Sequence, residues 1–182
     1  MKNNTNLVLV GMMGSGKSVI AKILSLQPGY KLVDTDHQIE KRQGAHVGQI
    51  IREKGEVFFR NLETQLLRDL VNRKNEKMIV ATGGGSILAL ENRNLLKELG
   101  NVVWLKAELD TLLKRVLDSD VDRPLLGSGS EQEIMRSLLR IYQDRLPLYQ
   151  SLADFTIEVD HHEPAQIAQQ ISDQFFAARF WR

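Results

Sequence analysis

The chain has 182 residues, of which 42% are hydrophobic and 26% are charged, and its formal net charge is +1. These fractions are typical of a globular protein, and the length predicts one domain over residues 1–182. So small a charge gives no strong overall attraction to nucleic acid or membrane, and we expect small-molecule partners and a monomer. The absence of cysteine excludes disulfides and thiolate metal sites and suits a cytoplasmic location.

Short apolar runs alternate with amphipathic segments along the chain, a pattern typical of βα units around a parallel sheet. The predicted strands are 7–10, 31–34, 77–81, 101–105 and 154–159. The predicted helices are 17–26, 36–43, 47–54, 55–73, 89–99, 108–117, 131–146 and 164–178. The first apolar run ends at Gly11, so it is too short for a signal peptide or a membrane span.

Two helix faces carry predicted packing contacts. Val19, Ile20, Ile23 and Leu24 follow helical spacing, so we expect them to pack the first helix on the sheet. The aromatic and basic tail, residues 175–182, is expected to dock the last helix on the sheet, with self-association as the alternative.

A phosphate-binding loop is the strongest functional signal. Residues 11–18 read Gly-Met-Met-Gly-Ser-Gly-Lys-Ser directly after the first predicted strand and match G-x-x-x-x-G-K-[ST]. In such a loop the backbone N–H groups around Gly14, Ser15 and Gly16 point at a polyphosphate. Lys17 can reach the β and γ oxygens, and the Ser18 hydroxyl can bind Mg²⁺. The sequence therefore predicts a nucleotide-binding site.

Two carboxylates follow the second predicted strand, in the run Asp34-Thr35-Asp36. Ligands of open parallel sheets bind at the carboxyl ends of the strands, so both side chains are expected at the binding edge. Asp34 is placed to hold Mg²⁺ through water, and Asp36 to accept a hydrogen bond from the hydroxyl that attacks the γ-phosphate. The alternative for Asp36 is a helix N-cap, because aspartate is favoured there.

Three glycines, Gly83, Gly84 and Gly85, follow the third predicted strand. Without Cβ atoms they let backbone N–H groups approach a polar ligand closely, although a plain flexible turn is the alternative.

Three arginines, Arg60, Arg123 and Arg145, can supply the positive charge needed for phosphoryl transfer and for an acidic substrate. A surface salt bridge from Arg60 to Glu56 and a helix-dipole role for Arg145 are the alternatives. Residues 118–130 read as a mobile lid carrying Arg123. The same segment lacks the glycine and glutamate of a calcium loop, and the four histidines lack the spacing of a metal site.

These motifs in this order resemble the shikimate kinase family. The resemblance rests on residues 11–18, 34–36, Arg60 with Glu63, 83–85, 123–126 and Arg145 with Tyr149. It implies a three-layer α/β/α fold of the P-loop kinase type, with a five-stranded parallel sheet and a mobile lid. It also implies transfer of the ATP γ-phosphate to the 3-hydroxyl of shikimate, with Mg²⁺ as cofactor.

The resemblance also implies a role for each site residue. Lys17 and Ser18 would hold the phosphates and the metal, and Arg123 would close over them from the lid. Asp36 would hold the shikimate hydroxyls and Arg60 and Arg145 its carboxylate, while the glycines 83–85 would line the pocket.

Three positions depart from the family pattern. Val19 stands where threonine is common and Ser86 where alanine is common, and Arg115 matches an adenine-side arginine only if one residue is inserted. The alternatives are another small P-loop kinase, such as a gluconate kinase, and a nucleotide-binding relative without catalysis.

Overall fold

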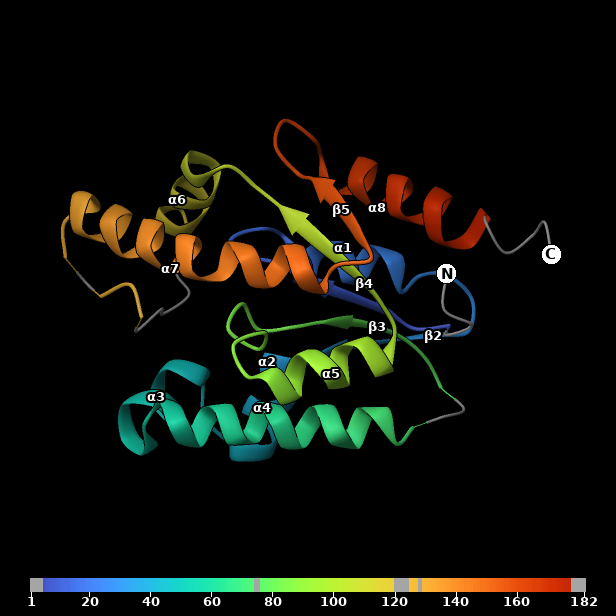
Figure 1. Ribbon diagram of the computed structural model, residues 1–182, viewed down its shortest axis with the longest axis horizontal. Coiled ribbons are helices and arrows are strands. Elements are labelled where there is room, and N and C mark those ends of the chain that lie inside the picture. The colour runs from blue at the N-terminus through green and yellow to red at the C-terminus, as the bar shows by residue number, and fades with distance from the viewer. Residues whose placement is uncertain (1–4, 74–75, 120–124, 128, 178–182) are drawn as a thin grey trace.

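The centre of the molecule is a five-stranded parallel sheet with the strand order β2-β3-β1-β4-β5 (Figure 1). This computed structural model describes residues 5–73, 76–119, 125–127 and 129–177. The strands are β1 (Leu7–Val10), β2 (Tyr30–Asp34), β3 (Lys77–Ala81), β4 (Asn101–Lys106) and β5 (Phe155–Glu158). Every residue of the middle strand β1 is buried, as expected for an apolar run covered on both faces. The edge strands β2 and β5 are partly exposed.

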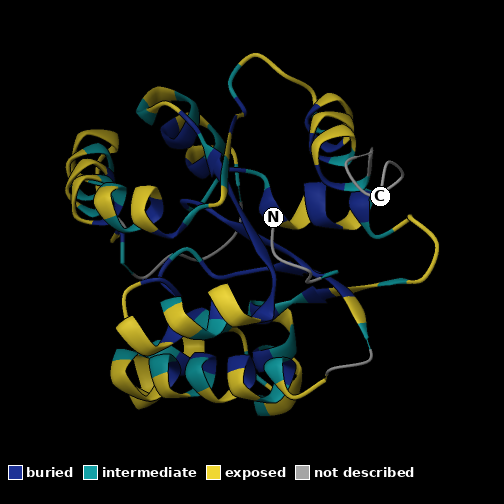
Figure 2. Cartoon of the chain, turned by 45° about the vertical axis from the view of Figure 1, so that its right-hand side comes forward, coloured by how far each residue is buried: buried dark blue, intermediate teal, exposed yellow. Residues whose placement is uncertain are grey.

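Helices cover both faces of this sheet. They are α1 (Lys17–Leu24), α2 (Thr35–Gln43), α3 (Val47–Lys54), α4 (Glu56–Val71), α5 (Leu90–Leu99), α6 (Leu109–Leu117), α7 (Glu131–Leu152) and α8 (Pro164–Ser172), followed by the π-helical turn η1 (Asp173–Ala177). On one side α4 packs against α5, and on the other α1 packs against α8 (Figure 1). The strands form a buried centre, while the outer helix faces are exposed (Figure 2). In the described part of the chain, no helix is both long and apolar enough to cross a bilayer.

The register of the sheet brings three chemically important strand ends together. Ala81 of β3 pairs with Leu9 of β1 on one side and with Asp34 of β2 on the other. Thr82, the next residue, donates its N–H and its hydroxyl to the carbonyl of Leu9. The segments that begin at Gly11, Asp34 and Gly83 therefore leave the sheet at one edge, as the sequence predicted.

Two predicted packing features need correction. Helix α7 does not end at Leu146 but continues through Pro147 to Leu152, because Tyr149 and Leu152 are buried there and tertiary packing outweighs the local cost of proline. Val19 is 53% exposed and not part of the core, whereas Ile20 and Leu24 are buried as predicted.

The first residues of the predicted tail pack against the rest of the molecule, as expected. Phe175 is buried, and Phe176 packs edge-on against Tyr30 of β2. Helix α8 ends at Ser172 and continues as a π-helical turn instead of an α-helix. The remainder of the predicted tail, residues 178–182, lies outside the described residues.

Candidate active site

The phosphate-binding loop joins β1 to α1. Gly14 and Gly16 have φ angles of 81° and 90°, which favour glycine, and a Cβ on Gly14 would lie 3.3 Å from the carbonyl oxygen of Leu112 in α6. Lys17 is buried and donates from Nζ to the carbonyl oxygens of Gly11 and Met12, at 2.8 Å each. The loop thus holds its lysine against its own backbone.

Ser15 is predicted to bind phosphate through its backbone N–H, and this role stays a prediction. Its side chain is fully buried and does not line the pocket. Its backbone N–H donates to the carbonyl of Met12 at 3.1 Å, inside the loop.

Ser18 and Asp34 lie together, as predicted for a metal-binding pair. The Ser18 hydroxyl donates to Oδ2 of Asp34 at 2.6 Å, and both residues line the same pocket. Oδ1 of Asp34 accepts from the backbone N–H of His37 at 3.2 Å, which makes Asp34 the N-cap of α2. The alternative that Asp36 is this N-cap is therefore wrong, because Asp36 lies inside the first turn.

Asp36 is held in an unusual electrostatic environment. Its Oδ1 atom is buried and has no hydrogen-bond partner within the described residues. Burial, with a further contribution from the negative charges of Glu63 and Asp34, raises the pKa of Asp36 from 3.8 to about 7. The positive charges of Lys17 and Arg60 act in the opposite direction. An aspartate of this kind can accept a hydrogen bond from a ligand hydroxyl.

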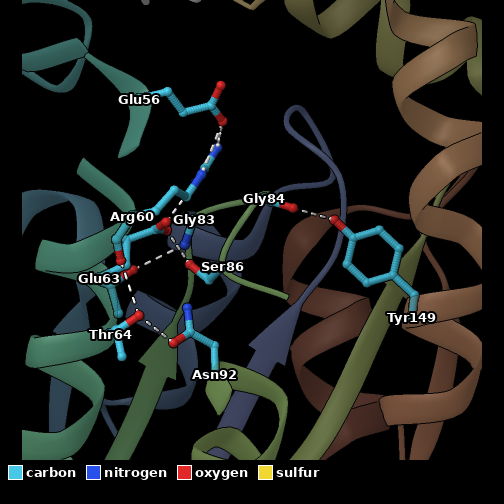
Figure 3. Close-up of polar contacts among 10 residues, drawn as sticks. Glu56, Arg60, Glu63, Thr64, Gly83, Gly84, Ser86, Asn92 and Tyr149 are labelled. Atoms are coloured by element: carbon cyan, nitrogen blue, oxygen red, sulfur yellow. Dashed lines mark hydrogen bonds and ion pairs between the residues drawn. The ribbon is translucent and has the colours of Figure 1, made fainter. Parts of the chain in front are cut away.

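Arg60 lies between two carboxylates of its own helix, Glu56 and Glu63 (Figure 3). Its Nη1 donates to Oε2 of the buried Glu63 at 2.6 Å, and its Nε and Nη2 donate to Oε1 of Glu56 at 3.1 and 2.7 Å. Burial alone would lower the pKa of Arg60, but these carboxylates outweigh it and the pKa is raised. Arg60 forms the predicted salt bridge to Glu56 and also lines the pocket. The salt bridge and a place in the binding pocket are therefore compatible.

The three glycines after β3 make room for these polar groups. A Cβ on Gly83 would lie 2.7 Å from Oδ1 of Asp36 and 2.9 Å from Oε1 of Glu63, and one on Gly85 would lie 2.6 Å from Cζ of Arg60. A Cβ on Gly84 would lie 3.2 Å from the backbone nitrogen of Met13. The run is therefore part of a packed site, and the alternative of a plain flexible turn is wrong.

Arg145 reaches the same pocket from α7. It is buried, and its Nη1 would lie 3.5 Å from a Cβ on Gly84. Tyr149, one turn further along, donates its hydroxyl to the carbonyl of Gly84 at 2.7 Å (Figure 3). Burial lowers the pKa of Arg145. Because α7 continues to Leu152, Arg145 lies well inside the helix, so the dipole interpretation of this residue is wrong.

One pocket of about 940 Å³ collects most of the predicted residues. It is lined by Gly14, Gly16, Lys17, Ser18, Asp34, Asp36, Arg60, Gly83, Gly84, Gly85 and Arg145, together with Leu125 of the predicted lid. Arg123 and part of the lid, residues 120–124 and 128, lie outside the described residues. No group of three or more histidine, cysteine, aspartate or glutamate side chains in the described ranges is arranged to hold a metal ion.

Sequence reasoning assigned no role to two side chains that complete the site. Ser86 is buried and donates its hydroxyl to Oε1 of Glu63, so Glu63 is held from both of its oxygens. Glu63 had a sequence signal, since it stands three residues after Arg60, the spacing of a helical ion pair. Ser86 had none beyond its place next to the glycines. Arg115, whose role was left open, donates to the carbonyls of Gly14 and Val159 and so borders the phosphate loop.

Comparison with known proteins identifies the family. The model of the family described as "Shikimate kinase" matches residues 13–175. The chain belongs to the shikimate kinase family. A shikimate kinase of Sulfurihydrogenibium sp. (strain YO3AOP1) is 41% identical over 166 residues, which cover 91% of this chain and 95% of the relative. A shikimate kinase of Xylella fastidiosa (strain 9a5c) is 40% identical over 91% of this chain and 89% of its own.

Solved shikimate kinase structures share the fold. The shikimate kinase of Acinetobacter baumannii in complex with shikimate has a TM-score of 0.88 and 34% identity, over 97% of this chain and 96% of that one. The Bacteroides thetaiotaomicron shikimate kinase has a TM-score of 0.84 and 26% identity, over 94% of this chain and 98% of that one. The predicted α/β fold of the P-loop kinase type, with helices on both faces of a five-stranded parallel sheet, is therefore confirmed.

Proposed function

We propose that this protein transfers the γ-phosphoryl group of ATP to the 3-hydroxyl of shikimate, giving shikimate 3-phosphate and ADP. The observation that carries the proposal is the pocket itself, in which a phosphate-binding loop and two arginines face the same space. In the reaction a bond forms between the hydroxyl oxygen and the γ-phosphorus. The bond from that phosphorus to the β,γ-bridging oxygen breaks, and the hydroxyl proton is released. Positioning and charge stabilisation supply most of the catalysis in such transfers.

The nucleotide end of the pocket is assigned to the phosphate loop. Backbone N–H groups around Gly14, Ser15 and Gly16 would bind the phosphates, and Lys17 would exchange its carbonyl partners for phosphate oxygens. Arg123 would add charge from the lid during transfer.

Magnesium is the cofactor that we propose for this end. The donor set fits the ion, because a hydroxyl and a carboxylate are hard oxygen ligands and Ser18 lies 2.6 Å from Asp34. Ser18 would bind the metal directly and Asp34 through water. When bound, Mg²⁺ would neutralise charge on the transferring phosphate.

The acceptor end is assigned to the residues around the glycine run. Shikimate carries one carboxylate and several hydroxyls, so its recognition requires both cations and hydrogen-bond acceptors. Arg60 and Arg145 would bind the carboxylate, Asp36 would orient the hydroxyls, and the glycines 83–85 would line the pocket beneath the ring. The lack of room for a Cβ at these glycines, next to the polar groups, supports the assignment.

Release of ADP from Mg-ATP, measured with shikimate, with gluconate and without an acceptor, tests the proposal. We expect release that depends on shikimate and is abolished by Lys17→Ala. Release with gluconate alone would keep the kinase fold and reject the substrate. ATP binding without phosphorylation of any acceptor would favour a nucleotide-binding relative without catalysis. The cytoplasmic location and the monomeric state remain predictions from the sequence.

A further inference from the structure

Arg60 is the proposed carboxylate-binding arginine, yet its guanidinium already contacts two carboxylates of the chain. Nη1 is directed to Glu63, and the Nε–Nη2 edge is directed to Glu56 (Figure 3). The edge formed by two parallel N–H groups is the one that binds a carboxylate in a bidentate manner. A substrate carboxylate that uses this edge must therefore replace Glu56.

The two internal partners of Arg60 differ in how firmly they are held. Glu63 has a side chain only 1% exposed, and its second oxygen accepts the hydroxyl of the buried Ser86. Removing this carboxylate from Arg60 would leave a charge buried without its partner. Glu63 is therefore a permanent anchor that keeps the guanidinium in the pocket.

Glu56 is bound much less firmly. Its side chain is 42% exposed, and a single oxygen, Oε1, accepts from both Nε and Nη2, so the pairing is not a bidentate fork. Water can solvate this carboxylate when it leaves. Glu56 is also the first residue of α4, where the helix dipole stabilises a negative charge with or without Arg60.

We propose that Glu56 is an exchangeable internal carboxylate that occupies the Nε–Nη2 edge of Arg60 until the carboxylate of the acceptor replaces it. Glu56 thereby lowers the affinity of the site for carboxylated acceptors and keeps Arg60 paired between turnovers. This inference rests on the proposed function, because it takes shikimate as the acceptor.

Steady-state kinetics of Glu56→Gln test the competition. The amide keeps the shape of the side chain and removes its charge, so the KM for shikimate should fall about two- to fivefold, the range of an exposed ion pair. The kcat and the KM for ATP should stay at the wild-type values, because Arg60 remains anchored by Glu63. A direct titration of shikimate into the variant should show the same gain in affinity.

The matched control is Glu53→Gln, which removes a charge three residues away. Glu53 is exposed and accepts from Gln49 of α3 instead of Arg60. An equal fall of KM in both variants would mean a general charge effect and would overturn the inference, as would an unchanged or raised KM in Glu56→Gln. Wild-type turnover is measured first, because the absence of shikimate-dependent turnover would reject the proposed function itself. If the wild type turns over shikimate and Glu56→Gln leaves the KM for shikimate unchanged, only the role of Glu56 is rejected.

Discussion

At the scale of single residues, burial and neighbouring charge act together on Asp36. One carboxylate oxygen is buried without a hydrogen-bond partner among the described residues, and Glu63 and Asp34 add negative charge nearby. Both effects disfavour ionisation, which is why the pKa rises to about 7. A residue so poorly satisfied in the free protein is placed for a ligand, because a hydroxyl of the acceptor would supply the missing hydrogen bond.

Asp36→Asn should stabilise the metal-free protein, and the gain should increase with pH. The folded protein holds the Asp36 proton more tightly than the unfolded chain, whose pKa is near 3.8. The stability contributed by the neutral carboxyl is therefore complete below pH 3.8 and is lost as the pH rises to about 7. Asparagine does not titrate, so the unfolding free energy of the variant relative to the wild type should grow by about 4 kcal/mol between low and neutral pH.

Thermal unfolding of both proteins in chelator, from about pH 4 to pH 7, measures this difference. A difference independent of pH would contradict the shifted pKa. Turnover by the same variant should fall, because the neutral amide is a weaker hydrogen-bond acceptor than the carboxylate and cannot take up a proton.

Gly85→Ala should damage the acceptor site without unfolding the protein. The added Cβ would lie 2.6 Å from Cζ of Arg60, so the guanidinium must move. Gly85 has no positive φ that alanine would avoid, so the backbone can keep its conformation. We expect the KM for shikimate to rise about ten- to hundredfold, with the KM for ATP nearly unchanged. An unchanged KM for shikimate would remove Arg60 from the acceptor site.

At the scale of elements, a hydrogen bond joins helix α7 to the segment after β3. The ring of Tyr149 stacks on Trp104 of β4 at a centroid distance of 5.7 Å, and its hydroxyl bonds the carbonyl of Gly84. Trp104 thus fixes the ring, and the ring fixes the glycine run relative to Arg145. The extension of α7 beyond Pro147 makes this contact possible.

Tyr149→Phe should keep the stacking and lose the hydrogen bond. The partly buried carbonyl of Gly84 would then lack this donor, so the free energy of unfolding should fall by about 1–2 kcal/mol. The KM for shikimate should rise as well, because the hydrogen bond that holds Gly84 in place relative to helix α7 and Arg145 is lost. Tyr142→Phe, at a partly buried tyrosine of the same helix, is the matched control. Denaturant unfolding and kinetics of both variants measure the effect, and equal losses would contradict the special role of Tyr149.

At the scale of the whole molecule, the strand order determines which chain segments meet. Because β3 lies between β1 and β2, the phosphate loop, the Asp34–Asp36 segment and the glycine run share one edge. Helices α4 and α7 then bring Arg60 and Arg145 to that edge from distant parts of the chain.

The small length and low net charge of the chain predict a monomer as the active species. Light scattering during size-exclusion chromatography should give the mass of a single chain, 20.7 kDa, with and without ligands. A dimer whose dissociation on dilution abolishes turnover would contradict this prediction.

Much of this architecture could be predicted from local patterns. The buried runs of β1, β3 and β4 are apolar enough to be recognised without any partner, and the G-x-x-x-x-G-K-[ST] loop carries its function in its own backbone. The ends of helices were less predictable. Pro147 predicts the end of a helix, yet α7 continues past it, because burial of Tyr149 and Leu152 outweighs the cost of the proline. The periodicity that assigned Val19 to the core could not distinguish an apolar residue facing the sheet from one facing the pocket.

The sequence by itself determined the alternating βα pattern and the phosphate loop, because each depends on neighbours within a few positions, and the resemblance to the shikimate kinase family supplied the residues of the acceptor site. Only the tertiary structure decided which of those residues touch. The anchoring of Glu63 by Ser86, the bond from Tyr149 to Gly84 and the raised pKa of Asp36 all join side chains from different elements. Such contacts depend on sheet order and helix packing, which arise from the burial of the whole chain and not from any local pattern.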